Sequence, residues 1–267
     1  MSKVVLITGG SSGIGKAVGI YLEAKGYVVY GTSRNAEKVK NHPFKLVSLD
    51  VRNPTTIEGA VATVIKNEGR LDVLINNAGM GITGPIEETN TDEMRQLFDT
   101  NFFGAIDVIK AVLPQMRAQK SGLIINVTSI AGYMGLPFRG IYSASKGALE
   151  LVTEALRMEV KQFGVQVTNV APGDFATNIA AGRYHAPVIK NSAYEATYQL
   201  NLDLMNAHVD EGKDPQIMAK AILKVIETNQ PKIHYKVGEF MQKFSIVLKR
   251  VLPDVWYEKL LMNHYKL

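Results

Sequence analysis

A tyrosine and a lysine four residues apart, Tyr142 and Lys146 in the sequence YSASK, could together transfer a proton. The surrounding stretch has helical spacing, and residues four apart on a helix lie on one face, one turn from each other. A lysine charge beside a phenol lowers the pKa of the phenol, which then exchanges a proton near neutral pH. The alternative is an ordinary surface pair on a solvated helix, because this spacing often occurs by chance.

A second group of residues suited to chemistry follows the first apolar segment, where KVVLIT runs into GGSSGIG. Glycines let the backbone turn sharply and approach a ligand closely. A helix begins directly behind them, and its N-terminus offers free N–H groups and a positive dipole end to a pyrophosphate. A tight strand-to-helix turn without a ligand is the alternative. The position between a first strand and a first helix favours dinucleotide binding by Gly9, Ser11, Ser12, Gly13, Ile14 and Gly15.

The elements that must position these residues are visible as alternating apolar and helical segments. Segments that are apolar on both sides suit strands buried on both faces of a parallel sheet, and they lie at 3–8, 27–32, 44–50, 71–79, 122–129, 165–172 and 231–238. Helical spacing occurs at 14–25, 54–67, 91–118, 141–163 and 214–228. The alternation predicts an α/β fold with a doubly wound parallel sheet of Rossmann type and helices on both faces. No linker or repeat interrupts the chain, so we expect one domain over 1–267.

Further motifs stand in order along the chain: NNAG at 76–79, then Asn101, then Ser129 at the end of GLIINVTS. Together with the glycine segment and the Tyr142–Lys146 pair, they resemble the short-chain dehydrogenase/reductase family over residues 3 to about 240. Within it, the chain most resembles the 17β-hydroxysteroid-dehydrogenase-like reductases. The resemblance implies an oxidoreductase that interconverts a ketone and a secondary alcohol on a small, lipophilic molecule of steroid, retinoid, sphingoid or acyl type.

The resemblance also implies a catalytic role for four residues. Tyr142 would exchange a proton with the carbonyl oxygen, and Lys146 would lower its pKa and bind the nicotinamide ribose. Ser129 would hydrogen-bond the substrate oxygen, although alone it would be read as a turn or cap residue. Asn101 would bend a helix and hold a water that relays protons to Lys146. A hydride arriving at a carbonyl carbon leaves negative charge on the oxygen, so hydrogen-bond donors must converge there.

Other cofactor contacts follow from the resemblance at three further strand ends. Asn77 would contact the adenine ribose or brace neighbouring strands, and Asp50 would contact adenine or cap the next element. The full set is Asp50 and Val51, then Asn77, Ala78 and Gly79, then Pro172, Gly173 and Thr177, with Tyr142 and Lys146 at the nicotinamide.

The end of the second predicted strand distinguishes NADP from NAD. An acidic residue there would bind the ribose 2′-hydroxyl and repel a 2′-phosphate. The chain has Ser33 and Arg34 instead, and a guanidinium suits phosphate geometry. We therefore favour NADP(H), with NAD(H) as the alternative, because Ser12 stands where many NADP-dependent relatives carry a basic residue.

Two segments fall outside the regular pattern. Residues 174–210 show no strong periodicity, which is typical of a substrate lid. The C-terminal tail, 238–267, is amphipathic: Phe240, Phe244, Leu248 and Leu252 are four apart, with Lys243, Lys249 and Arg250 beside them. Such a helix either packs on its own domain or a partner subunit, which we favour, or makes peripheral contact with an anionic membrane.

Composition narrows the classes of protein. There are no cysteines and the histidines lack metal-ligand spacing, so we expect no metal and a reducing, cytoplasmic location. The apolar segment KVVLIT begins too early for a cleaved signal peptide. The net charge of +5 comes from residues 213–267, which contain 10 basic and 5 acidic residues. The sequence has no dense cluster of basic residues of the kind that binds nucleic acid.

We expect a homo-oligomeric enzyme, and two alternatives stay open. A cofactor-sensing binding protein without turnover would keep the fold but would not need both Tyr142 and Lys146. A membrane-surface scaffold would depend on the tail alone. Between Ser129 and Tyr142, Met134 and Phe138 would line the substrate cleft or simply pack, and Tyr184 and His185 could contact substrate from the lid.

Overall fold

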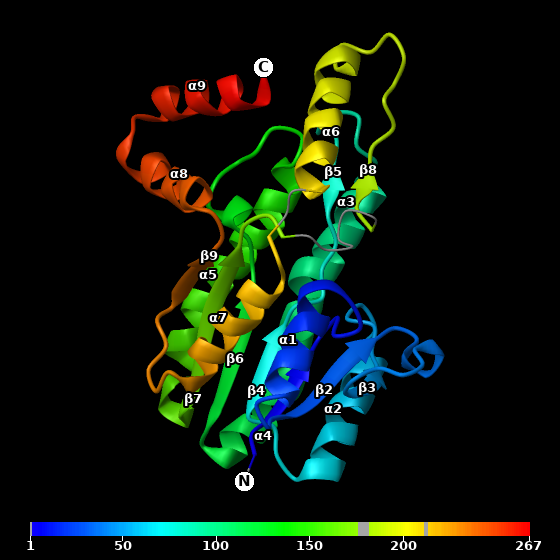
Figure 1. Ribbon diagram of the computed structural model, residues 1–267, viewed down its shortest axis with the longest axis vertical. Helices are drawn as coiled ribbons and strands as arrows, with labels where there is room; N and C mark the ends of the chain where they lie inside the picture. Colours follow the sequence, from blue (N-terminus) through cyan, green and yellow to red (C-terminus); the bar gives the residue numbers. More distant parts are fainter. Residues whose placement is uncertain (1, 176–181, 211–212) are drawn as a thin grey trace.

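The apolar segments of the chain form the strands of one parallel sheet (Figure 1). The computed structural model describes residues 2–175, 182–210 and 213–267. Neighbouring strands are parallel throughout and stand in the order β3-β2-β1-β4-β6-β7-β9. Their bounds are β1 (Val4–Ile7), β2 (Val28–Ser33), β3 (Lys45–Ser48), β4 (Val73–Asn76), β6 (Gly122–Val127), β7 (Val165–Pro172) and β9 (His234–Val237).

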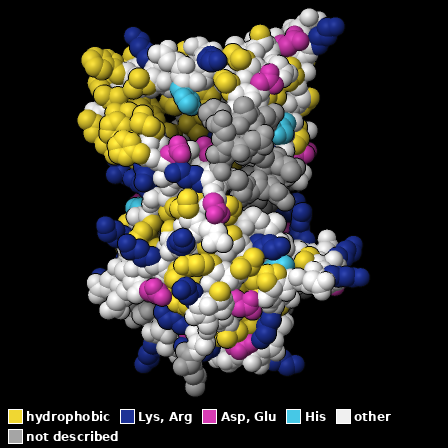
Figure 2. Space-filling model, viewed as in Figure 1, with side chains coloured by type: hydrophobic (Ala, Val, Ile, Leu, Met, Phe, Trp, Pro, Cys, Tyr) yellow, Lys and Arg dark blue, Asp and Glu magenta, His cyan; other side chains and the backbone are white. Residues whose placement is uncertain are grey.

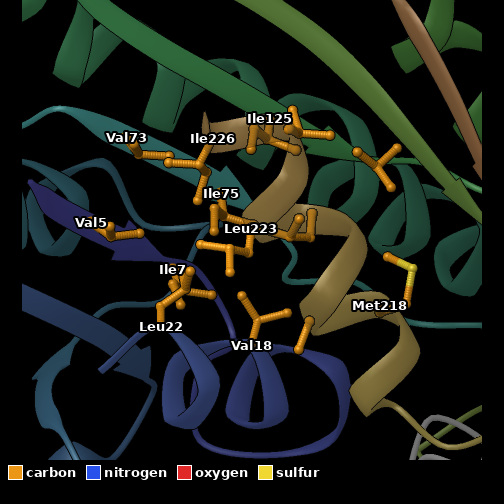
Figure 3. Close-up of a cluster of buried hydrophobic side chains, with 14 of the residues drawn as sticks. Val5, Ile7, Val18, Leu22, Val73, Ile75, Ile125, Met218, Leu223 and Ile226 are labelled. Atoms are coloured by element: carbon orange, nitrogen blue, oxygen red, sulfur yellow. The ribbon is translucent and has the colours of Figure 1, made fainter. Parts of the chain in front are cut away.

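Helices cover both faces of this sheet because its central strands are apolar on both sides. Successive residues Ile124 and Ile125 of β6 are both fully buried, and they enter opposite cores. One core lies under α1 (Gly13–Glu23) and α7 (Gln216–Glu227), whose side chains Figure 3 shows packed on β1 and β4. The other lies under α2 (Pro54–Glu68), α4 (Gly104–Gln119) and α5 (Gly140–Glu159). The predicted doubly wound fold is confirmed.

Local sequence sets where several helices begin and end. Asn53 caps α2 by accepting a hydrogen bond from the Thr55 N–H at 3.1 Å, and Pro54 takes the first helical position. The helix ends at Gly69, whose φ of +70° places it in the left-handed region that glycine adopts without strain. Two connections contain a short 3₁₀ turn. One is η1 (Ala36–Lys38), between β2 and β3, and the other is η4 (Lys161–Phe163), between α5 and β7.

The predicted helix over 91–118 is divided in two. Helix α3 (Thr91–Phe98) passes through a π-helical turn, η2 (Asp99–Phe103), into α4. The turn is centred on Asn101, whose buried side chain bonds the backbone of Met80 instead of lying along the helix surface. π turns of this kind often occur at functional sites. The family resemblance implied that Asn101 bends a helix, and the structure places a π-helical turn at this residue.

The segment predicted as a lid contains regular structure. Strand β8 (Tyr184–His185) pairs with β5 (Ile82–Thr83), and α6 (Glu195–Asp210) follows. Tyr198 of α6 is fully buried, and its hydroxyl donates to the carbonyls of Thr83 and Ala186, both at 3.0 Å. The helix was not predicted, because its apolar residues Tyr198, Leu200, Leu202 and Leu204 alternate with polar residues instead of following a helical period. That this segment acts as a lid stays a prediction.

The C-terminal tail forms two helices, α8 (Phe240–Val251) and α9 (Asp254–Tyr265), separated at Pro253 (Figure 1). The predicted stripe does not pack as one unit. Leu248 and Leu252 pack toward the domain in a small core, whereas Phe240 and Phe244 are exposed and stack on each other with ring centroids 5.6 Å apart. Across the residues that the structure describes, no helix is both long and apolar enough to cross a membrane.

Replacing Ile124 by alanine should remove apolar contacts from the core under α2 and α4. We expect the free energy of unfolding to fall by about 2–5 kcal/mol, the usual range for truncating a buried isoleucine to alanine. Ile20→Ala is the matched control, because Ile20 is 41% exposed on α1 and should cost much less. Urea denaturation of both variants measures the difference. Equal losses would contradict the assignment of Ile124 to the core.

Candidate active site

The glycine segment after β1 requires glycine for steric reasons. Gly9 and Gly13 have φ values of +65° and +52°, in the left-handed region that disfavours larger residues. A Cβ atom at Gly15 would overlap the carbonyl oxygen of Gly9, so the first turn of α1 lies directly against the loop. The chain therefore brings bare backbone and a helix N-terminus to the carboxyl edge of the sheet.

A cavity of about 500 Å³ opens beside this loop. That volume is in the range of pockets that hold small molecules and cofactors. Most of the cofactor-binding residues predicted from the sequence line it, namely Gly9, Ser11, Ser12, Gly13, Ile14, Ser33, Arg34, Asp50, Val51, Asn77, Ala78 and Gly79. The sequence analysis did not identify the other lining residues, which are Thr32, Leu49, Arg52, Met80, Gln96, Thr100 and Gly182.

Asn77 lines the cavity and also braces the loop. Its side-chain amide donates to the carbonyls of Thr8 at 3.0 Å and Gly9 at 3.2 Å. In return, the Thr8 hydroxyl accepts from the backbone N–H groups of Asn77 and Ala78. These bonds join the ends of β1 and β4, so the structural role considered for Asn77 is present alongside its place in the cavity wall.

The end of β2 carries the positive charge expected there, and Arg52 adds to it. Arg34 and Arg52 both line the cavity, and an Arg52 nitrogen lies 3.4 Å from an Asp50 oxygen. Burial opposes ionisation of Asp50, but hydrogen bonds from Arg52 and the charges of Arg52 and Arg34 hold its pKa below the ordinary value. Two guanidinium groups thus share one carboxylate, which leaves the rim of this corner positive.

Lys146 is buried within reach of the cavity wall. Only 5% of the residue is exposed, and its ammonium donates to the carbonyl of Val127 at 3.0 Å. A Cβ atom built on Gly79 would lie 3.5 Å from Lys146 Nζ and 3.2 Å from Asn101 Oδ1, so the NNAG segment, Lys146 and Asn101 meet at one point. Burial lowers the pKa of Lys146, while Tyr142 and Glu150 act to raise it.

Tyr142 lies one turn before Lys146 on α5 and is partly exposed, as a group that meets a substrate must be. The Arg139 guanidinium lies 5.5 Å from the centre of its ring. Ser129 leads from β6 into the 3₁₀ turn η3 (Ile130–Tyr133), where its hydroxyl accepts from the Ala131 N–H at 3.1 Å. That turn packs closely on α5, since a Cβ atom at Gly147 would approach the Gly132 carbonyl oxygen to 2.9 Å.

Asn101 links the segment after NNAG to helix α5. Its amide donates to the Met80 carbonyl at 2.9 Å and to the Ser145 hydroxyl at 3.3 Å, while its oxygen accepts from the Met80 N–H at 2.8 Å. Ser145 is the neighbour of Lys146 on α5. The structure therefore brings the π turn, the NNAG segment and the Tyr142–Lys146 helix together, as the sequence predicted.

Glu150 is the residue that the sequence analysis missed. It follows Lys146 by one turn of α5, and its buried carboxylate accepts hydrogen bonds from Thr128, from Tyr133 at 2.8 Å and from Asn169 at 3.0 Å. His234 Nδ1 lies 2.7 Å from the same carboxylate. Thr128, Tyr133 and Asn169 all donate, so both oxygens of the Glu150 carboxylate accept hydrogen bonds. The i,i+4 spacing from Lys146 was a visible signal, since Tyr142, Lys146 and Glu150 continue one helical face.

Other predicted residues lie outside the cavity wall. Pro172 and Gly173 end β7 at the same edge of the sheet, but Gly173 packs against Gln242 of α8, and Thr177 lies outside the described residues. Gly15 lies behind the loop. Met134 packs in the core under the tail.

Two further candidates for substrate contact pack toward the lid segment. Phe138 lies against Tyr198 of α6, with ring centroids 5.4 Å apart. His185 Nδ1 lies 2.8 Å from the Thr83 hydroxyl, and burial together with Arg183 lowers its pKa.

The residues present fit a dinucleotide. The glycine loop leaves open backbone where a Cβ atom would intrude, the cavity is large enough for part of the cofactor, and its far corner is positive. Among the described residues, no group of three His, Asp or Glu side chains is placed to hold a metal ion.

Comparison with known proteins agrees with this geometry. A family model described as short chain dehydrogenase matches residues 3–187. The chain is 40% identical over 257 residues to a Bacteroides thetaiotaomicron protein named 3-ketodihydrosphingosine reductase, with 94% of each chain covered.

Solved structures give the same result. A short-chain dehydrogenase from Streptomyces avermitilis superposes with a TM-score of 0.82 and 31% identity, covering 100% of this chain and 96% of that one. A structure of ElxO with NADP bound has a TM-score of 0.73 and 28% identity, covering 89% of this chain and 98% of that one.

Changing Glu150 to glutamine should lower the pKa of Lys146 further, because a negative charge that favours the ammonium is removed. The charged form of Lys146 should then be lost at a lower pH as the pH rises. NMR titration of the Lys146 side chain in ¹³C-lysine-labelled protein measures this pKa directly.

The matched control is Glu154→Gln, because Glu154 Oε1 lies 3.0 Å from His234 Nε2 but Glu154 is not among the groups that shift the pKa of Lys146. An unchanged or raised pKa in the Glu150 variant would contradict the coupling.

Proposed function

Because this chain belongs to the short-chain dehydrogenase/reductase family, and is therefore an NAD(P)-dependent oxidoreductase, we propose that it reduces the ketone of a lipophilic substrate with NADPH. The observation that carries the proposal is the buried Lys146 one turn from the partly exposed Tyr142, next to the NNAG segment that lines the cavity. Site residues Asn101, Ser129, Tyr142 and Lys146 form the proposed catalytic group.

The chain's own residues would do the proton chemistry. Bound cofactor supplies the hydride that reaches the carbonyl carbon. Tyr142 donates its hydroxyl proton to the carbonyl oxygen as the negative charge develops there, and Ser129 donates a hydrogen bond to the same oxygen. The Lys146 ammonium, held by the Val127 carbonyl, stabilises the tyrosinate that remains. Asn101, held by the Met80 backbone and Ser145 beside Lys146, would position a water that returns the proton.

The preference for NADP(H) is part of the proposal, with NAD(H) as the alternative. Arg34 and Arg52 both line the cavity where a 2′-phosphate would lie, and β2 ends in Ser33 without an acidic side chain. Asp50 is engaged by Arg52 and so is less able to repel a phosphate. The NADP bound in the similar ElxO structure supports the same choice.

The lipophilic substrate follows from the surroundings of Tyr142. The loop between Ser129 and Tyr142 contributes Met134 to one apolar cluster and Phe138 to another, so apolar side chains flank the site on two sides. The relative named 3-ketodihydrosphingosine reductase makes a long-chain sphingoid ketone the first substrate to test. Steroid, retinoid and acyl-type ketones form the rest of the panel.

Charge near Tyr142 supports acyl-type ketones as a second candidate. Arg139 lies over the Tyr142 ring, and the pKa of Arg183 is lowered by burial and by the charge of Arg139, which places two cations in this region. They would attract a substrate with an anionic group and repel the ammonium of a sphingoid base. Asp174, which lies close enough to Arg183 to affect its pKa, is the carboxylate that could receive such an ammonium.

Homo-oligomeric assembly and cytoplasmic location remain parts of the proposal. Exposed Leu151 and Met158 are seven residues apart on α5, 68% and 73% exposed, and form an outward apolar stripe that a second subunit could cover. The absence of cysteines suits a reducing compartment.

Tyr142→Phe should abolish most turnover while leaving the fold and cofactor binding intact, because it keeps the ring and removes only the acid. We expect rate losses of about 10² to 10⁴ or more, the usual scale for a general acid. The measurement follows NADPH absorbance at 340 nm with the panel of sphingoid, acyl, steroid and retinoid ketones. Tyr27→Phe is the matched control, because Tyr27 precedes β2 at the amino ends of the strands, opposite the edge that carries the site.

Near-normal turnover by a folded Tyr142→Phe variant would show that Tyr142 is not the general acid. A wild-type protein that binds NADPH but reduces no ketone in the panel would favour the cofactor-sensing alternative.

Arg34→Ala should weaken NADPH binding by about 1.5–3 kcal/mol, the range for a hydrogen bond to a charged group. NADH binding should change little, because NADH lacks the 2′-phosphate. Calorimetric titration with both cofactors measures the contrast. Lys38→Ala, which removes an exposed cation from nearby η1, is the control. Equal losses for NADPH and NADH would show that Arg34 does not recognise the phosphate.

A further inference from the structure

The outer side of helices α8 and α9 is an exposed apolar surface. Of the 18 large hydrophobic side chains that are exposed in the described part of the chain, 10 lie in residues 240–267. Figure 2 shows them as a continuous hydrophobic area over α8 and α9, at the upper left of the view. We call this area the tail surface, and its principal members are Phe240, Phe244, Val247, Val251, Val255 and Trp256.

Helix α8 has two distinct faces. Phe240, Phe244, Val247 and Val251 are spaced by four, three and four residues, so they share one face, and all four are exposed. The opposite face buries Ile246 almost completely and packs Leu248 toward Met134. The inner face therefore attaches the helix to its own domain. Packing on the domain does not explain why the outer face is also apolar. Contiguous exposed apolar patches commonly mark interaction sites.

Basic side chains accompany the tail surface. Residues 240–267 contain five basic residues, Lys243, Lys249, Arg250, Lys259 and Lys266, against the acidic Asp254 and Glu258. Lys249 is neutralised by Asp254 at 2.7 Å, whereas Arg250 and Lys259 are exposed. A surface that combines apolar side chains with an excess of cations is complementary to a partner that has a negatively charged surface and an apolar interior.

We propose that the tail surface docks on an anionic membrane surface. Amphipathic helices bind there by burying their apolar face among the lipids while cations meet the headgroups. Trp256 is 64% exposed and is the only tryptophan in the chain, and tryptophan is enriched at the boundary between lipid and water. A second copy of the chain fits less well, because it would bring the same excess of positive charge against the first.

The inner side of the same helices reaches the candidate active site. Tyr257 of α9 directs its hydroxyl to the sulfur of Met134 at 2.7 Å. Arg139, which lies over the Tyr142 ring, is close enough to Tyr265 of α9 for its charge to oppose the rise that burial causes in the pKa of Tyr265. Figure 2 shows the surface hollowed beside the tail, with hydrophobic side chains inside the hollow. Docking would thus place the active site next to the lipids in which an apolar ketone dissolves. Membrane binding itself does not rest on the proposed reaction, so the two fail separately.

The single tryptophan gives a direct test. Full-length wild-type protein is mixed with vesicles of phosphatidylcholine alone or with phosphatidylglycerol added, and Trp256 emission is recorded. We expect a blue shift and quenching by bromine-labelled lipid chains with the anionic vesicles, weakened by salt because the cation contribution is screened. Unchanged emission, with no protein in the vesicle pellet, would overturn the proposal.

Two variants separate the apolar and charged contributions. Val251→Glu places a charge on the centre of the exposed face, where it should weaken vesicle binding by at least about 10-fold, since a charged group resists transfer into lipid. Arg250→Gln with Lys259→Gln should weaken it by about 30-fold, because each cation near an anionic surface contributes about fivefold. Ile20→Glu, at a 41% exposed position on α1, is the matched control and should bind as wild type.

Circular dichroism on the same samples checks that each variant keeps its fold. Light scattering measures the oligomeric state. Equal losses in Val251→Glu and Ile20→Glu would overturn the proposal, as would vesicle binding that survives both tail variants. A wild-type oligomer that Val251→Glu converts to smaller species, without vesicle binding by either protein, would assign the tail surface to a second copy of the chain instead.

Discussion

The buried ammonium of Lys146 is the interaction on which the arrangement of the site depends. An isolated charge is very unfavourable inside a protein, so it persists only where acceptors and an opposite charge surround it. The Val127 carbonyl at the end of β6 provides the acceptor, and Glu150, one turn further along α5, provides the negative charge. Glu150 is itself buried and therefore requires donors, which come from Thr128, Tyr133, Asn169 and His234. Satisfying one lysine thus ties α5 to β6, β7, β9 and η3.

The parallel sheet explains why the remaining residues meet at one edge. All strands of the large sheet point in the same direction, so the segments that leave their carboxyl ends emerge side by side. The glycine loop follows β1, Asn77 follows β4 and Ser129 follows β6. Hydrogen bonds from Asn77 to the backbone of Thr8 and Gly9 hold two of these segments at a fixed separation. The cavity is therefore a consequence of strand direction, and the glycines let the loop pack closely on α1 and the NNAG segment.

Features of the fold and the site could be predicted where residues close together in the sequence determine them. The strands, the helices α1, α2, α5 and α7, and most of the cavity wall follow from apolar periodicity and the order of motifs. Glu150 was missed because the groups around its carboxylate, Thr128, Asn169 and His234, come from distant parts of the chain. Arg52 was missed although its partner Asp50 is only two residues away, because nothing in the local sequence shows that the pair faces a cavity. The tail was predicted as one amphipathic stripe, but Pro253 ends α8 because proline cannot continue a helix, and only part of the stripe finds space against Met134.

The loop between Ser129 and Tyr142 separates two chemically different halves of the molecule. On the cofactor side, the walls are backbone, hydroxyls and guanidinium groups, which suit a phosphorylated ligand. On the other side, Met134 packs against the tail and Phe138 packs against Tyr198 of α6, so α6 and the two tail helices flank the loop that leads to Tyr142. The tail helices contact the loop through apolar packing around Met134, whereas hydrogen bonds to the backbone of Thr8, Gly9 and Met80 fix the cofactor side. Substrate selectivity can therefore change through α6, α8 and α9 without disturbing the buried lysine that the cofactor side requires.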